Sequence, residues 1–354
     1  MMSPMYVAEI VADGIAQRVF PGAVHAVGMP DGTVRQRAFG FHRYDESSPV
    51  VTVDTCYDWA SLTKMVCATA ALRLIGTGQI GLHDEVARYL PGAAPVVTIR
   101  HLLTHTSGLD VRLSTAAQAG SQGLWDAVMA TRPSAVPGTR VAYANVNTLL
   151  LGRLLEQVTG MGLATLVEVL VLRSVGMTAT CFTPAASQWS AIPPTEQDAH
   201  RGVVQGSVHD ESAATLGGVA GHAGLFGPAI DLVRFGQGWL DTLRDDSPWQ
   251  IPAPLATMAL TNQSPVGQLG CGLGWMLQRE SFMGQALHAT AAHTGFTGPI
   301  IAIVPERGYT WVLLSNRTWP VRSEARHHAV SARISDALWL AADGIDGVLD
   351  DDMQ

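Results

Sequence analysis

The only lysine of the chain follows a serine by three residues, in the stretch Trp59-Ala60-Ser61-Leu62-Thr63-Lys64. The 354 residues include 22 lysines and arginines, so arginine serves at every other basic position. Arginine stays protonated in proteins, whereas a partly buried lysine can lose its proton. Residues three apart share a helix face, so the Lys64 amine can reach the Ser61 hydroxyl and act as its base. The simpler alternative is a helix-capping serine followed by a surface lysine.

Two further short motifs carry groups that suit acyl chemistry. Tyr143-x-Asn145 precedes an apolar helical pattern, and His293-Thr294-Gly295 is followed by Phe296. Taken alone, a tyrosine of this kind is typical of a half-buried aromatic residue, and an asparagine before a helix is typical of an N-cap. Only the joint pattern with Ser61 and Lys64 favours catalysis.

The three motifs, in this order and spacing, resemble the serine β-lactamase and penicillin-binding protein superfamily. The closer resemblance is to its class C β-lactamase-like branch, which includes esterases of the same fold. His101–Leu109 and Gly217–Phe226 look like that branch as well, and the resemblance covers about residues 20–340. It implies a serine hydrolase that forms an acyl-enzyme.

The resemblance also implies a role for each motif residue. Ser61 would be the nucleophile, Lys64 the amine that helps to deprotonate it, and Tyr143 the group that shuttles the proton. The oxyanion hole would consist of the backbone N–H groups of Ser61 and Phe296. The remaining motif residues would bind substrate, namely Asn145, His293, Thr294 and Gly295. Asn145 would alternatively hold Lys64.

His293 departs from the Lys-Thr-Gly pattern of that superfamily, in which the lysine offers a fixed positive charge to a substrate carboxylate. An ordinary histidine has a pKa near 6.5 and is mostly neutral at pH 7. The sequence therefore favours a carboxylesterase acting on a small acyl ester. The alternatives are an acyltransferase or amide-forming enzyme, then a D,D-peptidase or β-lactamase, and last a non-catalytic binding module.

A metal site is the main competing interpretation of the histidines. His101 and His105 are spaced to share one helix face, and His209-Asp210-Glu211 with His222 could add ligands. No glutamate follows His101, so the zinc-protease pattern is absent. We expect no metal and no cofactor, and we expect these histidines to pack or to cap helices.

Composition restricts the partners. The net charge is −8 without a basic block, which argues against nucleic acid. The first 20 residues do not resemble a signal peptide, and no apolar run reaches the length of a membrane span. The four cysteines lack metal-type spacing and suit free thiols. We therefore predict a cytoplasmic protein with a small-molecule acyl substrate and no membrane partner, and its oligomeric state stays open.

The elements that must position these residues follow from the hydrophobic pattern. Strand-like segments lie near both ends, and helical segments lie between them. We predict an α/β (α+β) fold of the β-lactamase/transpeptidase type, with an antiparallel sheet built from both termini. Residues 1–354 would form one catalytic unit, with an α/β part at about 1–58 and 255–354 and a helical part at about 59–254. The segment Thr183–Ala214 is predicted to be a long loop that shapes the pocket.

Overall fold

The computed structural model describes residues 6–322, 325–341 and 344–349. Its main sheet is antiparallel, in the order β2-β1-β11-β10-β9-β8, and both ends of the chain contribute to it. The strands are β1 (Gly22–Gly28), β2 (Val34–Gly40), β3 (Tyr57–Asp58), β4 (Cys181–Phe182), β5 (Glu196–Asp198), β6 (Gly202–Val204), β7 (Leu225–Gly227), β8 (Met276–Leu277), β9 (Ala291–Thr294), β10 (Ile300–Val304) and β11 (Tyr309–Ser315). The predicted fold class is confirmed.

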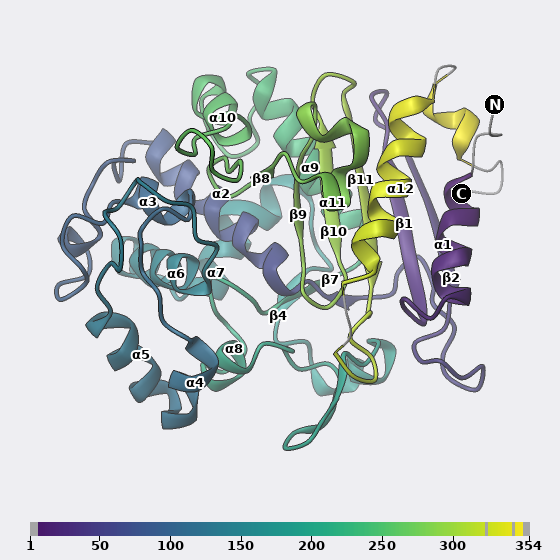
Figure 1. Cartoon of the computed structure of the whole chain (residues 1–354), viewed down its shortest axis with the longest axis horizontal. Helices are drawn as coiled ribbons and strands as arrows, with labels where there is room; N and C mark the ends of the chain where they lie inside the picture. The colour runs from purple at the N-terminus through teal and green to yellow at the C-terminus, as the bar shows by residue number, and fades with distance from the viewer. Residues whose placement is uncertain (1–5, 323–324, 342–343, 350–354) are drawn as a thin grey trace.

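The α-helices lie mainly between the strands of that sheet in sequence, as predicted. They are α1 (Val7–Ala16), α2 (Thr63–Gly76), α3 (Ile99–Leu103), α4 (Leu113–Ala116), α5 (Gly120–Ala130), α6 (Asn145–Thr159), α7 (Leu163–Val167), α8 (Glu211–Thr215), α9 (Ala229–Leu243), α10 (Ala253–Leu260), α11 (Glu280–Met283) and α12 (His327–Leu340). Figure 1 shows α3 to α6 gathered on one side of the molecule and the sheet on the other.

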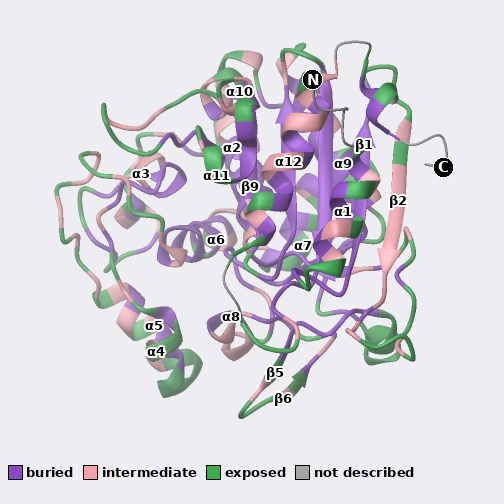
Figure 2. Cartoon of the chain, turned by 45° about the vertical axis from the view of Figure 1, so that its right-hand side comes forward, coloured by how far each residue is buried: buried purple, intermediate pink, exposed green. Residues whose placement is uncertain are grey.

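Helices cover both faces of the sheet, and alternate side chains of a strand point to opposite faces. On β11, Trp311 and Leu313 belong to a core shared with α1 and α12, and Val312 and Leu314 belong to a core shared with α9. Helix α9 falls in the helical part of the predicted division, yet it packs against β1 and β11. Strand β2 is at the edge and is only partly buried, as its colour in Figure 2 shows.

The segment Thr183–Ala214 is more ordered than the sequence suggests. It contains a 3-10 turn at Ala186–Ala191 and the β5–β6 hairpin, and it reaches α8 at its end. The sequence analysis left the conformation of this segment open, because the hairpin is too short to produce a clear alternating pattern. The hairpin extends from the lower edge of the molecule in Figure 2.

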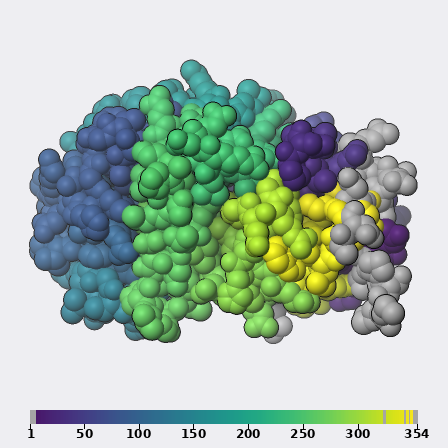
Figure 3. Space-filling view, turned by 90° about the horizontal axis from the view of Figure 1, so that it is seen from above, coloured from purple at the N-terminus to yellow at the C-terminus, as the bar shows by residue number. Residues whose placement is uncertain are grey.

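A second small sheet, in the order β3-β7-β4, pairs the strand just before the predicted nucleophile with two strands from the helical part of the sequence. Seen from above, the surface formed by residues near 250–290 separates the helical region from the C-terminal helix (Figure 3).

No single helix of the described residues is long and apolar enough to cross a membrane, although the bent pair formed by Asn145–Thr159 and Leu163–Val175 passes that test by length and composition.

Candidate active site

Ser61 lies in a one-turn 3-10 helix, Ala60–Leu62, that runs directly into α2. The preceding residue, Trp59, is fully buried and fixes this turn: its backbone N–H donates to Leu225 O at 2.9 Å, and its indole N–H donates to Gly227 O at 3.0 Å. The serine is thus attached to β7 of the small sheet.

The backbone just before Ser61 adopts a conformation that residues with a Cβ rarely use. Ala60 has φ of +45°, and its N–H donates to Asp58 Oδ1 at 2.8 Å. The second carboxylate oxygen of Asp58 accepts from His209 N at 2.7 Å. Burial raises the pKa of Asp58 to about 6, although both backbone donors lower it. Sequence reasoning missed Asp58, because only the folded chain brings residue 209 to it.

Lys64 lies in the first turn of α2 and is 1% exposed. Its amine donates to Ser61 Oγ at 2.6 Å and to the main-chain carbonyl of His222 at 3.1 Å. A buried amine needs such partners, because burial without hydrogen bonds is costly. The spacing-based expectation that the Ser61 and Lys64 side chains meet therefore agrees with the structure.

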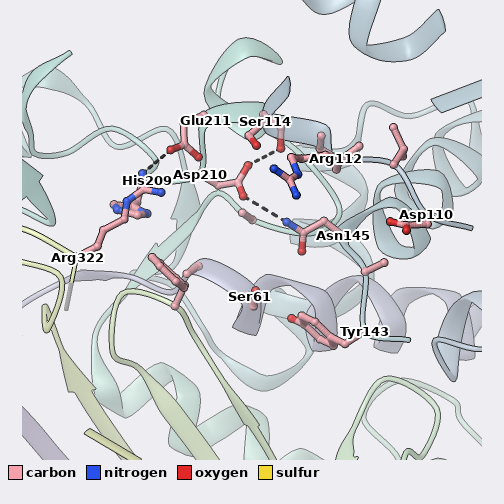
Figure 4. Close-up of a pocket in the computed structure, with 17 residues that line it drawn as sticks. Ser61, Asp110, Arg112, Ser114, Tyr143, Asn145, His209, Asp210, Glu211 and Arg322 are labelled. Atoms are coloured by element: carbon pink, nitrogen blue, oxygen red, sulfur yellow. Dashed lines mark hydrogen bonds and ion pairs between the residues drawn. The ribbon is translucent and has the colours of Figure 1, made fainter. Parts of the chain in front are cut away.

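Tyr143 stands beside this pair, with the centre of its ring 5.1 Å from Lys64 Nζ. Its hydroxyl points towards Ser61 in Figure 4. His105 brackets the tyrosine: its carbonyl accepts from Ala142 N at 2.9 Å, and its Nδ1 accepts from Ala144 N at 3.3 Å. The rings of His105 and Tyr143 also pack at 4.7 Å. His105 therefore sets the path of the loop that carries Tyr143.

Asn145 is the first residue of α6, and Ala144 is the N-cap, so the capping alternative does not hold. Asn145 Nδ2 donates to Asp210 Oδ2 at 3.4 Å, drawn as a dashed line in Figure 4. The expectation that Asn145 would hold Lys64 is not met, since His222 O takes that place. Asp210 entered the sequence analysis only as a possible metal ligand, and its contact with Asn145 spans 65 residues.

The end of β9 approaches the turn before Ser61 so closely that only glycine fits there. A Cβ on Gly295 would lie 2.7 Å from Trp59 O. Thr297 Oγ1 donates to Asp58 O at 2.8 Å and fixes the same junction from the sheet side. Gly295 therefore joins the two parts of the site through backbone packing. In the described chain, the N–H of Phe296 has no protein acceptor, so it is available to an oxyanion.

His293, which the sequence analysis assigned to substrate binding, is buried and is not among the residues that line the cavity. It is 2% exposed on β9, with its ring 5.9 Å from that of Tyr143 and its Nδ1 2.9 Å from Thr294 O. Burial, with the nearby charge of Lys64, lowers the pKa of His293 to about 3. The ring is therefore neutral at any physiological pH and is covered by Tyr143.

A cavity of about 480 Å³ opens over Ser61. Four predicted site residues line it, namely Ser61, Tyr143, Asn145 and Phe296. The other lining residues adjoin these or come from four further segments, and they were not foreseen as a set (Figure 4): Ala60, Asp110, Val111, Arg112, Leu113, Ser114, Ala144, His209, Asp210, Glu211, Ser212, Ala223 and Arg322. Lys64, His293, Thr294 and Gly295 lie outside the lining.

The histidines considered as metal ligands have other partners. His101 Nδ1 accepts from Thr98 N at 3.2 Å within the capping box of α3. His209 packs against Phe296 at 5.5 Å, and its Nε2 lies 3.0 Å from Glu196. Across the described residues, no three histidine, cysteine, aspartate or glutamate side chains converge as a metal site would require.

The comparisons with known proteins place the chain in a family. The profile of the Beta-lactamase family matches residues 7–334, so the chain belongs to that family and is a serine hydrolase of the β-lactamase fold. A protein of Escherichia coli strain K12 named "Putative D-alanyl-D-alanine carboxypeptidase" is 31% identical over 329 residues, covering 80% of this chain and 75% of the relative.

Two solved structures share the fold over nearly the whole chain. EstCE1, described as a hydrolase with promiscuous acyltransferase activity, superposes with a TM-score of 0.75 at 22% identity, covering 94% of this chain and 97% of its own. A β-lactamase/D-alanine carboxypeptidase from Pseudomonas syringae gives 0.74 at 19% identity, covering 95% and 98%. At these identities the likeness is one of fold.

Proposed function

We propose that the protein hydrolyses small carboxylic esters through an acyl-enzyme on Ser61. The observation that carries the proposal is the 2.6 Å contact between Ser61 Oγ and the buried amine of Lys64. Along that line a neutral amine accepts the hydroxyl proton as Oγ attacks the acyl carbon. The proton passes through Tyr143 to the leaving oxygen, which departs as an alcohol. Water then attacks the acyl-enzyme, and its proton returns to Ser61 along the same path.

Charge that develops on the acyl oxygen needs two donors. The Phe296 N–H and the N–H of Ser61, in the 3-10 turn just before α2, would supply them. One such donor is typically worth about 2.7–4 kcal/mol in kcat. Phe296 is also held in place, because its carbonyl accepts from Arg317 Nε at 2.8 Å and the Arg317 guanidinium stacks 4.7 Å from its ring.

The preference for esters rests on β9, the strand of the main sheet that approaches Ser61. The position that would carry a fixed cation for a substrate carboxylate holds His293, which is buried and neutral. This favours acyl donors without a carboxylate beside the scissile bond. The second candidate is D,D-carboxypeptidase activity, which the name of the E. coli relative suggests. Acyl transfer to an alcohol or amine is the third, suggested by the description of EstCE1.

Intact-mass spectrometry on wild type and Ser61→Ala tests the proposal. The probes are p-nitrophenyl acetate, a fluorophosphonate, a penicillin and a D-Ala-D-Ala peptide. We expect a single adduct and ester turnover in wild type only, with the penicillin and the peptide reacting far more slowly. Esterase activity retained by folded Ser61→Ala would overturn the serine mechanism. Faster acylation by the peptide than by the ester would replace esterase with carboxypeptidase.

A further inference from the structure

Asp210 lines the cavity and accepts hydrogen bonds from four other residues. Its Oδ1 accepts from Ala213 N at 2.8 Å, from Ser212 Oγ at 2.5 Å and from His222 Nε2 at 3.1 Å, and its Oδ2 accepts from Asn145. Burial acts to raise the pKa of Asp210, but His222 and the hydrogen bonds lower it well below the usual range. The carboxylate is therefore ionised and can only accept hydrogen bonds.

One arm of this network reaches Lys64. An ionised Asp210 requires a hydrogen on His222 Nε2, which fixes the orientation of a ring that is fully buried. The carbonyl of the same histidine accepts from Lys64 Nζ. The backbone beside it has little room, because a Cβ on Gly221 would lie 2.1 Å from Thr148 O. The ring and the packed glycine together set the carbonyl that orients the amine.

The other arm reaches Asn145. A carboxylate cannot donate, so the amide nitrogen of Asn145 must face Asp210 and its amide oxygen must face away from it. Asn145 lines the cavity, and this orientation presents an acceptor to a bound substrate. Asp210 thereby acts on two groups near Ser61, on the Lys64 amine through His222 and on the Asn145 amide directly, and the second contact is drawn in Figure 4.

The trio of Asp210, Ser212 and His222 is not a second catalytic triad. In a triad the acid and the serine meet different nitrogens of the imidazole. Here both meet Nε2, at 3.1 and 3.0 Å, and Nδ1 has no partner among the described residues. A proton therefore cannot pass through the imidazole from Ser212 to Asp210. The geometry of the cluster suits a positioning role instead.

We propose that Asp210 is a positioning residue for acylation, acting through His222 on Lys64 and directly on Asn145. The inference rests on the proposed role of Ser61. Displacing a reacting group by about 1 Å can cost about a hundredfold in rate. Asp210→Asn keeps the shape of the side chain but loses one acceptor and the charge, so it should release at least one arm.

The experiment measures the fluorophosphonate labelling rate of Ser61, and kcat and KM for p-nitrophenyl acetate. We expect Asp210→Asn to lower the labelling rate and kcat by about 10- to 100-fold, with KM changed by less than about threefold. Thr98→Ala is the matched control, because it also removes a side-chain cap, on α3 outside the cavity, and should leave both rates unchanged. A merely structural role would move the melting temperature of both variants and neither rate.

A second variant keeps the test decisive if Asp210→Asn does not fold. His222→Gln leaves Asp210 in place as the cap of α8 and should lower the same rates. In the double variant the two losses should add only in part, since both variants break the arm that runs through His222. Folded variants that label at the wild-type rate would overturn the inference, and so would fully additive losses. Wild type that is never labelled would instead refute the proposed function of Ser61.

Discussion

The helical side and the sheet side of the pocket bring different kinds of groups to Ser61. On the helical side, Lys64 and Asn145 each donate a hydrogen bond to a distant segment that holds them in place. On the sheet side, β9 contributes backbone and a buried neutral ring, His293. The side chains that could move protons thus lie on one side, and the other provides shape and backbone donors. Substitutions on the helical side should therefore lower the reaction rate, whereas those on the sheet side should change stability or substrate preference.

Lys64→Met should give the largest effect. It removes the amine but fills a similar volume without a buried amino group that needs hydrogen-bond partners, so the variant should remain folded. Loss of a positioned general base typically costs about 10²–10⁴ in rate. We expect a fall of that size in kcat/KM for p-nitrophenyl acetate, with a melting temperature at or above that of wild type. A loss smaller than tenfold would remove Lys64 from the proton path and weaken the division between the two sides.

His105→Ala should have the next largest effect. It removes the acceptor for Ala144 N and the ring that packs on Tyr143, so the hydroxyl of Tyr143 should lose its position. We expect kcat/KM to fall about 10- to 100-fold. His101→Ala, one turn earlier, is the matched control and should retain activity. Treatment with EDTA should leave the activity of wild type and of His101→Ala unchanged. Inactivation by EDTA would revive the metal interpretation.

The sequence predicted local features of the site and missed those that depend on distant contacts. The Ser61–Lys64 pair could be predicted because helix geometry brings residues three apart together. The role of Asp210 could not be, because its partner Asn145 is 65 residues away and the acceptor for Lys64 is 158 residues away. Similarly, only the fold shows that Tyr143 covers His293.

The same distinction holds for the fold. The β1–β2 and β10–β11 hairpins were predictable, because strand-like segments flank turns with glycine at positive φ, Gly32 at +86° and Gly308 at +69°. The β5–β6 hairpin was not, because its strands have three residues each and little apolar alternation. Its place next to the pocket comes from tertiary contacts such as that of Arg322 with Glu196, at 2.9 Å.

A third prediction concerns the sheet, where buried imidazoles lower stability in acid. Burial lowers the pKa of His25 on β1 to about 3, and neither of its nitrogens has a partner among the described residues. Between pH 6.5 and 3 the unfolded chain binds a proton that the folded chain excludes, so stability falls as the pH drops. From pH 8 to pH 5 this linkage should cost about 2 kcal/mol.

His25→Leu should remove that part of the acid sensitivity. Urea unfolding at pH 5 and pH 8 measures it, because the effect of the substitution on packing is common to both pH values and cancels in the difference. We expect the variant to lose about 2 kcal/mol less than wild type over this range. His83→Leu, at an exposed histidine, should lose as much as wild type. Equal losses in all three proteins would mean that His25 is protonated or solvated in the folded state.

The smallest effect is expected at His293, and it decides whether the sheet side recognises charge. With a pKa lowered to about 3, this ring should stay neutral from pH 8 to pH 6. The ratio of kcat/KM for an ester bearing a carboxylate to that for its neutral analogue should follow the same pH profile in wild type and in His293→Gln. Comparing the two proteins cancels the titration of groups that both share. A ratio that rises towards pH 6 in wild type and is flat in His293→Gln would show that His293 is protonated beside the substrate. The sheet side would then act on substrate charge as well as on shape, and the preference for uncharged esters would lose its support.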